Sequence, residues 1–125
     1  MTTEQDIKVE VQTAYVDAQS EPDNNRYVFA YTIRITNASS EAHQLLNRHW
    51  VITDASGEVE EVRGEGVVGQ QPKLLPGEHF EYTSGAVLKT PVGSMHGEYE
   101  FISSTGQLFL VPIQAFSLFV PSVVH

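Results

Sequence analysis

The stretch that most clearly indicates the fold is Tyr27–Asn37, with the sequence YVFAYTIRITN. Its large apolar residues recur at every second position, at Phe29, Tyr31, Ile33 and Ile35. A period of two is typical of a strand that buries one face. β-branched and aromatic residues also favour the pleated surface of a sheet. The stretch therefore predicts a β-strand packed on a hydrophobic core.

Strand patterns of the same kind continue on both sides of this stretch. The further predicted strands are Ile7–Tyr15, His43–Asp54, Val59–Arg63, His79–Leu88, Met95–Ser103 and Gln107–Phe119. Turn residues separate the strands at intervals of about 8–12 residues, a pattern typical of an all-β sandwich or barrel. Pro112 cannot donate a hydrogen bond to a ladder, which places the last strand at an edge or a bulge. We expect one domain over residues 1–125, with Met1–Asp6 as a loose tail.

The aromatic residues refine this prediction. Trp50 lies on the third predicted strand, where immunoglobulin-like domains carry a core tryptophan. The sixth strand contains Gly97, Tyr99 and Phe101 at alternate positions, with Phe101 at the place of the antibody cysteine. We therefore predict an all-β fold: an immunoglobulin or fibronectin type III-like β-sandwich of about seven antiparallel strands in two sheets.

Composition narrows the range of partners. The formal net charge is -9, and only 7 of the 125 residues are Lys or Arg. Binding to nucleic acid or to an anionic membrane needs clustered basic residues, so neither is expected. There is no cysteine, which excludes disulfides and thiolate metal sites. Because the sequence shows neither a signal peptide nor a long apolar run, we expect a cytoplasmic protein. We expect it to be a monomer or a homodimer and to bind another protein. The acidic net charge would tolerate a basic partner best.

One loop, Arg63–Gly77 (RGEGVVGQQPKLLPG), concentrates glycine and proline. Its first part fits the pattern G-x-G-x-x-G, which in dinucleotide-binding domains precedes a helix. Gln70-Gln71-Pro72 follows instead, so that interpretation fails. Successive glycine N–H groups can still hold an anion without a helix. The candidate phosphate or pyrophosphate ligands are then Gly64, Gly66, Gly69 and Lys73; the alternative is that the glycines only allow turns and bulges.

The second part of the loop places two leucines between prolines. Leu74 and Leu75 follow Pro72 and precede Pro76, so they cannot belong to a regular helix. Two interpretations remain open. The leucines close the end of the sandwich, or they form an exposed apolar docking point for a partner.

A metal site is a further possibility on the sixth strand. His96, Glu98 and Glu100 share one face, and His49 becomes a neighbour if the third and sixth strands pair. Nitrogen and carboxylate ligands suit Zn, Co or Mn. Alternating His and Glu residues are equally typical of a solvent-facing strand, and the sequence contains no tight His-x-His pair. We therefore assign no metal and no cofactor, and keep direct metal binding as a third hypothesis.

Catalysis is not expected from the sequence. The pattern G-x-S-x-G does not occur, and no serine stands in a local nucleophile motif. A spatial Ser–His–Asp arrangement is recognised by geometry and not by sequence position. No residue pattern points to one, and the sequence predicts a protein that is not an enzyme.

Taken together, the chain resembles the bacterial ApaG family. The matching segments are Tyr31–Asn37, Leu45–Trp50, Ile52–Asp54, Gly64–Pro72, Leu75–Glu78, Tyr82–Gly85 and Thr90–Tyr99. The resemblance implies a fibronectin type III or immunoglobulin-like sandwich that occurs alone in bacteria. It also implies a protein-recognition role, since the domain occurs in certain eukaryotic F-box proteins and in a polymerase-interacting protein.

The same resemblance implies a link to cobalt resistance and magnesium efflux without an established catalytic activity. Nucleotide or pyrophosphate binding is suspected for the family from its glycine motif. Our leading hypothesis is a non-catalytic protein-interaction domain with an indirect part in divalent-cation homeostasis. The alternative is a binder of phosphate- or pyrophosphate-containing small molecules.

Overall fold

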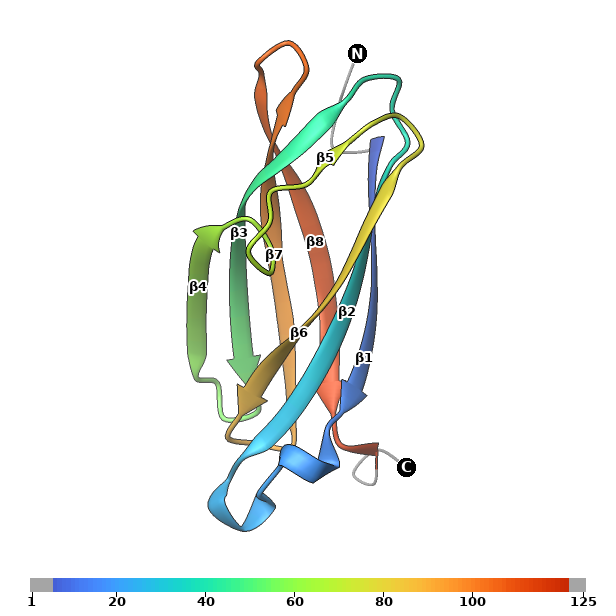
Figure 1. Cartoon of the computed structure of the whole chain (residues 1–125). Helices are drawn as coiled ribbons and strands as arrows, with labels where there is room; N and C mark the ends of the chain where they lie inside the picture. Colours follow the sequence, from blue (N-terminus) through green and yellow to red (C-terminus); the bar gives the residue numbers. More distant parts are fainter. Residues whose placement is uncertain (1–5, 122–125) are drawn as a thin grey trace.

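The computed structural model describes residues 6–121 and arranges them as two antiparallel sheets packed face to face (Figure 1). One sheet has three strands in the order β1-β2-β6. These strands are β1 (Ile7–Tyr15), β2 (Tyr27–Asn37) and β6 (His79–Leu88). Two short 3-10 helices, Asp17–Gln19 and Pro22–Asn24, lie in the connection between β1 and β2.

The second sheet has five strands and carries the surfaces discussed below. Its main order is β4-β3-β7-β8, and β5 pairs with β3 outside that path. The strands are β3 (His43–Asp54), β4 (Val59–Glu65), β5 (Lys73–Leu74), β7 (Val92–Ser103) and β8 (Leu108–Phe119). Between residues 6 and 121 no helix is long and apolar enough to cross a membrane.

The predicted fold class is confirmed, with small changes at the strand ends. The predicted strands Ile7–Tyr15, Tyr27–Asn37, His43–Asp54 and His79–Leu88 have the bounds that the structure gives them. The sixth predicted strand begins earlier, at Val92, because residues 92–94 already pair with β3 and β8. The two-residue strand β5 is an eighth strand that the sequence did not predict, since two residues carry no period.

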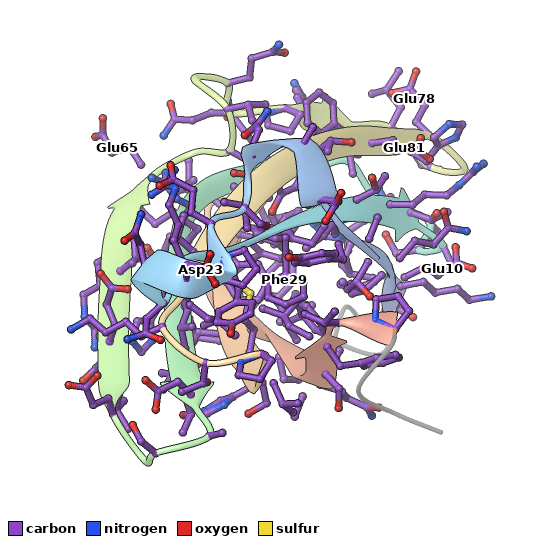
Figure 2. The ribbon with its side chains drawn as sticks, turned by 90° about the horizontal axis from the view of Figure 1, so that it is seen from below. Glu10, Asp23, Phe29, Glu65, Glu78 and Glu81 are labelled. Atoms are coloured by element: carbon purple, nitrogen blue, oxygen red, sulfur yellow. The ribbon has the colours of Figure 1, made fainter. Side chains whose placement is uncertain are left out.

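The hydrophobic core lies between the sheets, as the alternating pattern predicts. Phe29, Ile33 and Ile35 of β2 are at most 1% exposed, and Tyr99 and Phe101 of β7 are fully buried. In the view along the strands in Figure 2, Phe29 lies in the interior. The predicted core position of the only tryptophan is also confirmed, since Trp50 is 2% exposed and packs edge-on against Tyr31 at 5.4 Å between ring centroids.

The edge position predicted for the last strand is confirmed. β8 ends the path β4-β3-β7-β8, and the register between β7 and β8 shifts between Met95 and Gly97. Pro112 pairs with Glu98 of β7 on this edge strand. An edge strand tolerates proline because only one side of it must supply ladder hydrogen bonds. The predicted loose tail lies outside the described residues except for Asp6, whose carbonyl oxygen accepts a 2.7 Å hydrogen bond from the Ala38 amide.

Candidate functional site

The glycine loop is a tight turn attached to the end of β4. The Val67 amide donates to the carbonyl of Gln70 at 2.8 Å, and the Gln70 amide donates back to Val67 at 2.9 Å. The two central residues, Val68 and Gly69, have φ angles of 43° and 79°. Positive φ at both central positions defines a type I′ turn. A β-branched residue is rarely found at positive φ, so Val68 marks a strained position.

Arg48 of β3 holds this loop from inside. Its Nη1 atom donates hydrogen bonds to the carbonyl oxygens of Glu65 at 2.9 Å and of Gly66 at 3.0 Å. The Gly66 amide donates to the Leu46 carbonyl at 2.7 Å. The loop therefore turns two carbonyl oxygens toward the chain's own cation. In an anion-binding nest, by contrast, N–H groups would point at the ligand.

The sequence did not identify Arg48 as a functional residue. The signal that could have found it is its position two residues before Trp50 on β3, which puts the two side chains on the same face of the strand. An arginine on the same face as a core tryptophan needs partners, because even a half-buried charge is costly when it is not hydrogen-bonded. The carbonyl oxygens of the glycine loop are those partners.

The four predicted anion ligands lie against different parts of the surface. Gly64 lines a cleft on the outer face of the five-stranded sheet, Gly69 a small cavity between the sheets, and Lys73 a third hollow beside Phe80. The Gly66 amide is already used inside the loop. The structure thus does not bring Gly64, Gly66, Gly69 and Lys73 together around one ligand.

The two leucines of the loop have opposite environments. Leu74 belongs to β5, is 4% exposed and joins the core. Leu75 is 51% exposed, and its amide donates to the Glu78 carboxylate at 2.8 Å. Leu74 therefore closes the sandwich, as one of the two interpretations stated. Of the pair, only Leu75 is placed to meet a partner.

The outer face of the five-stranded sheet carries a row of charged residues. His49 of β3 faces Glu98 of β7 in register, which confirms the predicted pairing of these strands. The His49 Nε2 atom lies 2.8 Å from the Glu61 carboxylate, and its Nδ1 atom lies 3.7 Å from that of Glu98. The hydrogen bond from His49 is the main cause that lowers the pKa of Glu61. Asn47 donates a 2.7 Å hydrogen bond to Glu100 in the next row.

A cleft of about 440 Å³ opens on this outer face. Its walls are formed by β3, β4 and β7, and Leu110 of β8 lines one side. Leu108 and Leu110 are 55% and 51% exposed, two of the most exposed large apolar side chains among residues 6–121. They alternate with buried Val111 and partly buried Phe109, so they point away from the core. The cleft is therefore lined mainly by charged and polar side chains, with exposed leucines along one side.

The residues proposed as metal ligands do not converge. His96 pairs across the sheet with Val51, while Glu98 and Glu100 are next to His49 and Asn47. Within the part of the chain that the structure describes, no group of three His, Asp or Glu side chains could hold a metal ion. The direct metal-binding hypothesis therefore has no supporting geometry here.

Two tyrosine hydroxyls meet in the interior near Arg48. The hydroxyl groups of Tyr82 and Tyr99 are 2.5 Å apart. Burial raises the pKa of both tyrosines, and the Arg48 guanidinium acts weakly in the opposite direction. The pair is therefore neutral, and the positive charge of Arg48 faces a polar group inside the sandwich.

Comparison with known proteins identifies the family of this chain. A family model described as the ApaG domain matches residues 17–103, which include the glycine loop, Arg48 and the strands from β2 to β7. The chain belongs to the ApaG family. It is 53% identical over 120 residues to Protein ApaG of Acidithiobacillus ferrooxidans, covering 96% of this chain and 94% of the relative. It is 56% identical over 119 residues to Protein ApaG of an Azoarcus species, covering 95% and 94%.

A solved structure shares the fold over nearly the whole length. The crystal structure of the putative ApaA protein from Bordetella pertussis superposes with a TM-score of 0.91 at 54% identity. It covers 93% of this chain and 94% of that one. The exposed leucines of β8 lie beyond residue 103 and so outside the segment that the ApaG model matches.

Proposed function

We propose that this ApaG-family chain is a non-catalytic protein-interaction domain whose partner docks on the outer face of the five-stranded sheet. The observation that carries the proposal is the combination of the 440 Å³ cleft with the exposed leucines of β8 beside it. Interfaces commonly combine a buried apolar anchor with a polar rim. Leu108 and Leu110 are the anchor, and Glu98 and Glu100 belong to the rim.

The charge of the domain favours a particular kind of partner. The net charge is -9, and Glu61, Glu98 and Glu100 all lie on the docking face. A partner segment that carries Lys or Arg next to apolar side chains would complement this face. The Glu98 and Glu61 side chains are 39% and 56% exposed, so they remain accessible to such groups although His49 contacts both.

The hydrogen bonds of the serine hydroxyls support a non-catalytic function. In the described region, the hydroxyls of Ser103 and Ser104 are paired with Thr105 and Glu41, at 2.9 Å in both cases. No serine hydroxyl of residues 6–121 is hydrogen-bonded to a histidine, the arrangement that would activate it as a nucleophile. A role in cobalt or magnesium homeostasis would then be indirect, through the partner, and a cytoplasmic partner is expected.

Affinity capture from cytosol tests the proposal with matched variants. The Leu108→Asp, Leu110→Asp double variant replaces the apolar anchor with two carboxylates. Val87→Asp is the control, since Val87 is 50% exposed on β6 of the other sheet. We expect the double variant to lose proteins that both the wild type and the Val87 variant retain. Identical captured sets for all three folded proteins would contradict docking at this face. A Leu75→Asp variant tests the loop separately.

A further inference from the structure

A small cavity of about 170 Å³ lies between the two sheets, under the glycine loop. Tyr82 and Ser84 of β6 form one side of it, and Arg48 and Trp50 of β3 form the other. The type I′ turn closes the opening with Val68 and Gly69. In Figure 1 the segment between β4 and β5 passes across the five-stranded sheet. Arg48 is the one residue that lines both this cavity and the cleft on the outer face.

Several hydrogen-bond donors beside this cavity have no acceptor among the described residues. Arg48 has five N–H groups, and only Nη1 takes part in hydrogen bonds between described residues. The indole N–H of Trp50 is buried and has no hydrogen-bond partner in the described region. Buried donors are normally satisfied, so these groups call for an acceptor. The cavity is therefore suited to a ligand that only accepts hydrogen bonds.

The charge around the cavity favours the same kind of ligand. Arg48 is the only ionised residue among the described residues that line the cavity, and no carboxylate lines it. The Glu65 carbonyl oxygen holds Arg48, but the Glu65 side chain projects outward at the periphery in Figure 2. Tyr82 is neutral because burial raises its pKa. A guanidinium without a facing carboxylate in a partly dry site favours binding of an anion.

The size and lining of the cavity select the anion. A volume of about 170 Å³ holds one small oxyanion but not a nucleotide. Arg48 supplies the only positive charge among the described residues of the lining, which neutralises a singly charged carboxylate but leaves a doubly charged phosphate uncompensated. The planar fork of a guanidinium also matches a carboxylate in two-point contact. We propose that this inter-sheet cavity binds a single carboxylate group through Arg48.

The carboxylate has two possible sources. It belongs to a small free carboxylic acid, or to the C-terminus of a peptide that enters past Val68, which is 52% exposed at the rim. Both sources require the same contacts with Arg48. The inference does not need a partner on the docking face, because Leu108 and Leu110 do not line this cavity, although Arg48 lines both sites.

The only tryptophan of the chain gives a direct readout. Trp50 lines the cavity, so its single indole N–H resonance reports on the site without further assignment. Sodium acetate is titrated into the full chain at constant ionic strength, with sodium chloride as the reference and sodium phosphate as the competing anion. We expect a saturable shift of the indole resonance with acetate and none with chloride. Absence of a saturable shift with acetate, or saturation by phosphate alone, would overturn the proposal.

A pair of variants separates the cavity from the rest of the surface. Val68→Asp places a negative charge at the rim, while Val68→Asn has nearly the same shape without the charge. Both residues tolerate positive φ better than valine, so both variants should fold. We expect at least a tenfold weaker response to acetate in Val68→Asp and a retained response in Val68→Asn. Equal responses would place acetate elsewhere and overturn the proposal.

Titration with a peptide identifies the source of the carboxylate. The tripeptide N-acetyl-Gly-Gly-Ala is compared with its C-terminal amide in the same titration. A peptide that binds at least tenfold more tightly than acetate, with an inactive amide, identifies a chain terminus. Equal binding of peptide and acetate identifies a small free carboxylate. A response to the amide equal to that of the acid would contradict carboxylate recognition.

Discussion

Gly64 lies directly against the guanidinium group of Arg48. A Cβ atom built at Gly64 would be 2.8 Å from both terminal nitrogens of Arg48, closer than real Cβ contacts allow. A Cβ atom at Gly66 would overlap the carbonyl oxygen of Gln70, and Gly66 also has a φ of 61°. The first two glycines of the motif are therefore required by the arginine and the turn. No bound phosphate is needed to explain them.

This relationship predicts a ranking of glycine substitutions. Gly66→Ala should lower the free energy of unfolding by about 3 kcal/mol, since it combines positive φ with overlap of the backbone. Gly64→Ala should cost about 1 kcal/mol, because the flexible end of Arg48 can move at the expense of a hydrogen bond. Gly57→Ala is the control, with positive φ in open space and a cost of about 1 kcal/mol. Urea unfolding measures all three, and equal losses at Gly66 and Gly57 would contradict the account.

The strained turn predicts a stabilising substitution. Val68→Asn should raise the free energy of unfolding by about 1 kcal/mol, because asparagine tolerates the φ of 43° that valine resists. The matched control is Val59→Asn on β4, where the backbone is not in the positive-φ region and valine suits the strand. Thermal unfolding should show a higher melting temperature for the first variant and a lower one for the second. A lower melting temperature for both would show that Val68 is not strained.

The two leucines of the loop should respond differently to truncation. Leu74→Ala removes a core side chain and should cost about 2–4 kcal/mol of unfolding free energy. Leu75→Ala removes an exposed one and should stay within about 0.5 kcal/mol of the wild type. Both are measured by urea unfolding under identical conditions. Similar values for the two variants would contradict the burial difference between 4% and 51%.

The buried histidine predicts a pH dependence of stability. His43 is 1% exposed, neither ring nitrogen has a hydrogen-bond partner in the described region, and Phe109 packs edge-on at 5.1 Å. Burial lowers the pKa of His43, against the carboxylates of Glu41 and Asp6, which raise it. The unfolded chain therefore binds a proton more readily than the folded one. The contribution of neutral His43 to the free energy of unfolding is fully present above the ordinary histidine pKa near 6.5. It is lost as the pH falls through the lower pKa of the folded state.

Urea unfolding between pH 7.5 and 5 measures the slope of the free energy of unfolding against pH. The variant His43→Leu should flatten the part of the slope that His43 contributes. Phe109→Leu removes the ring that packs on His43 without changing a titratable group, so it should lower stability at every pH and retain the slope. An unchanged slope in the His43 variant would contradict the assignment.

Much of the fold could be predicted from the sequence, because a strand with one buried face has apolar side chains at every second position. Tyr27–Asn37 and His79–Leu88 show this directly. The strand β5 could not be found, since Lys73 and Leu74 form one pair of bridges to β3 and show no period. The opposite burial of Leu74 and Leu75 was also open, because prolines interrupt the alternation there.

The candidate sites were harder to predict for a different reason. Arg48 meets Glu65 and Gly66, which are 17 and 18 residues away in the chain, so the contact depends on the pairing of β3 with β4. The glycine pattern showed where the backbone is special but not which groups it turns inward. The sequence did not indicate that the exposed leucines of β8 lie beside a cleft, because their position depends on the pairing of β8 with β7.

Site-specific photo-crosslinking tests docking on the five-stranded sheet most directly. A photoreactive benzoylphenylalanine replaces Leu110 on the proposed docking face or Val87 on the other sheet, which have similar exposure at 51% and 50%. After irradiation in cells, we expect a discrete protein adduct at position 110 that is absent at position 87. The adduct should also disappear when Leu108→Asp is added. Equal adducts at both positions, or an adduct at position 87 alone, would contradict docking on the five-stranded sheet.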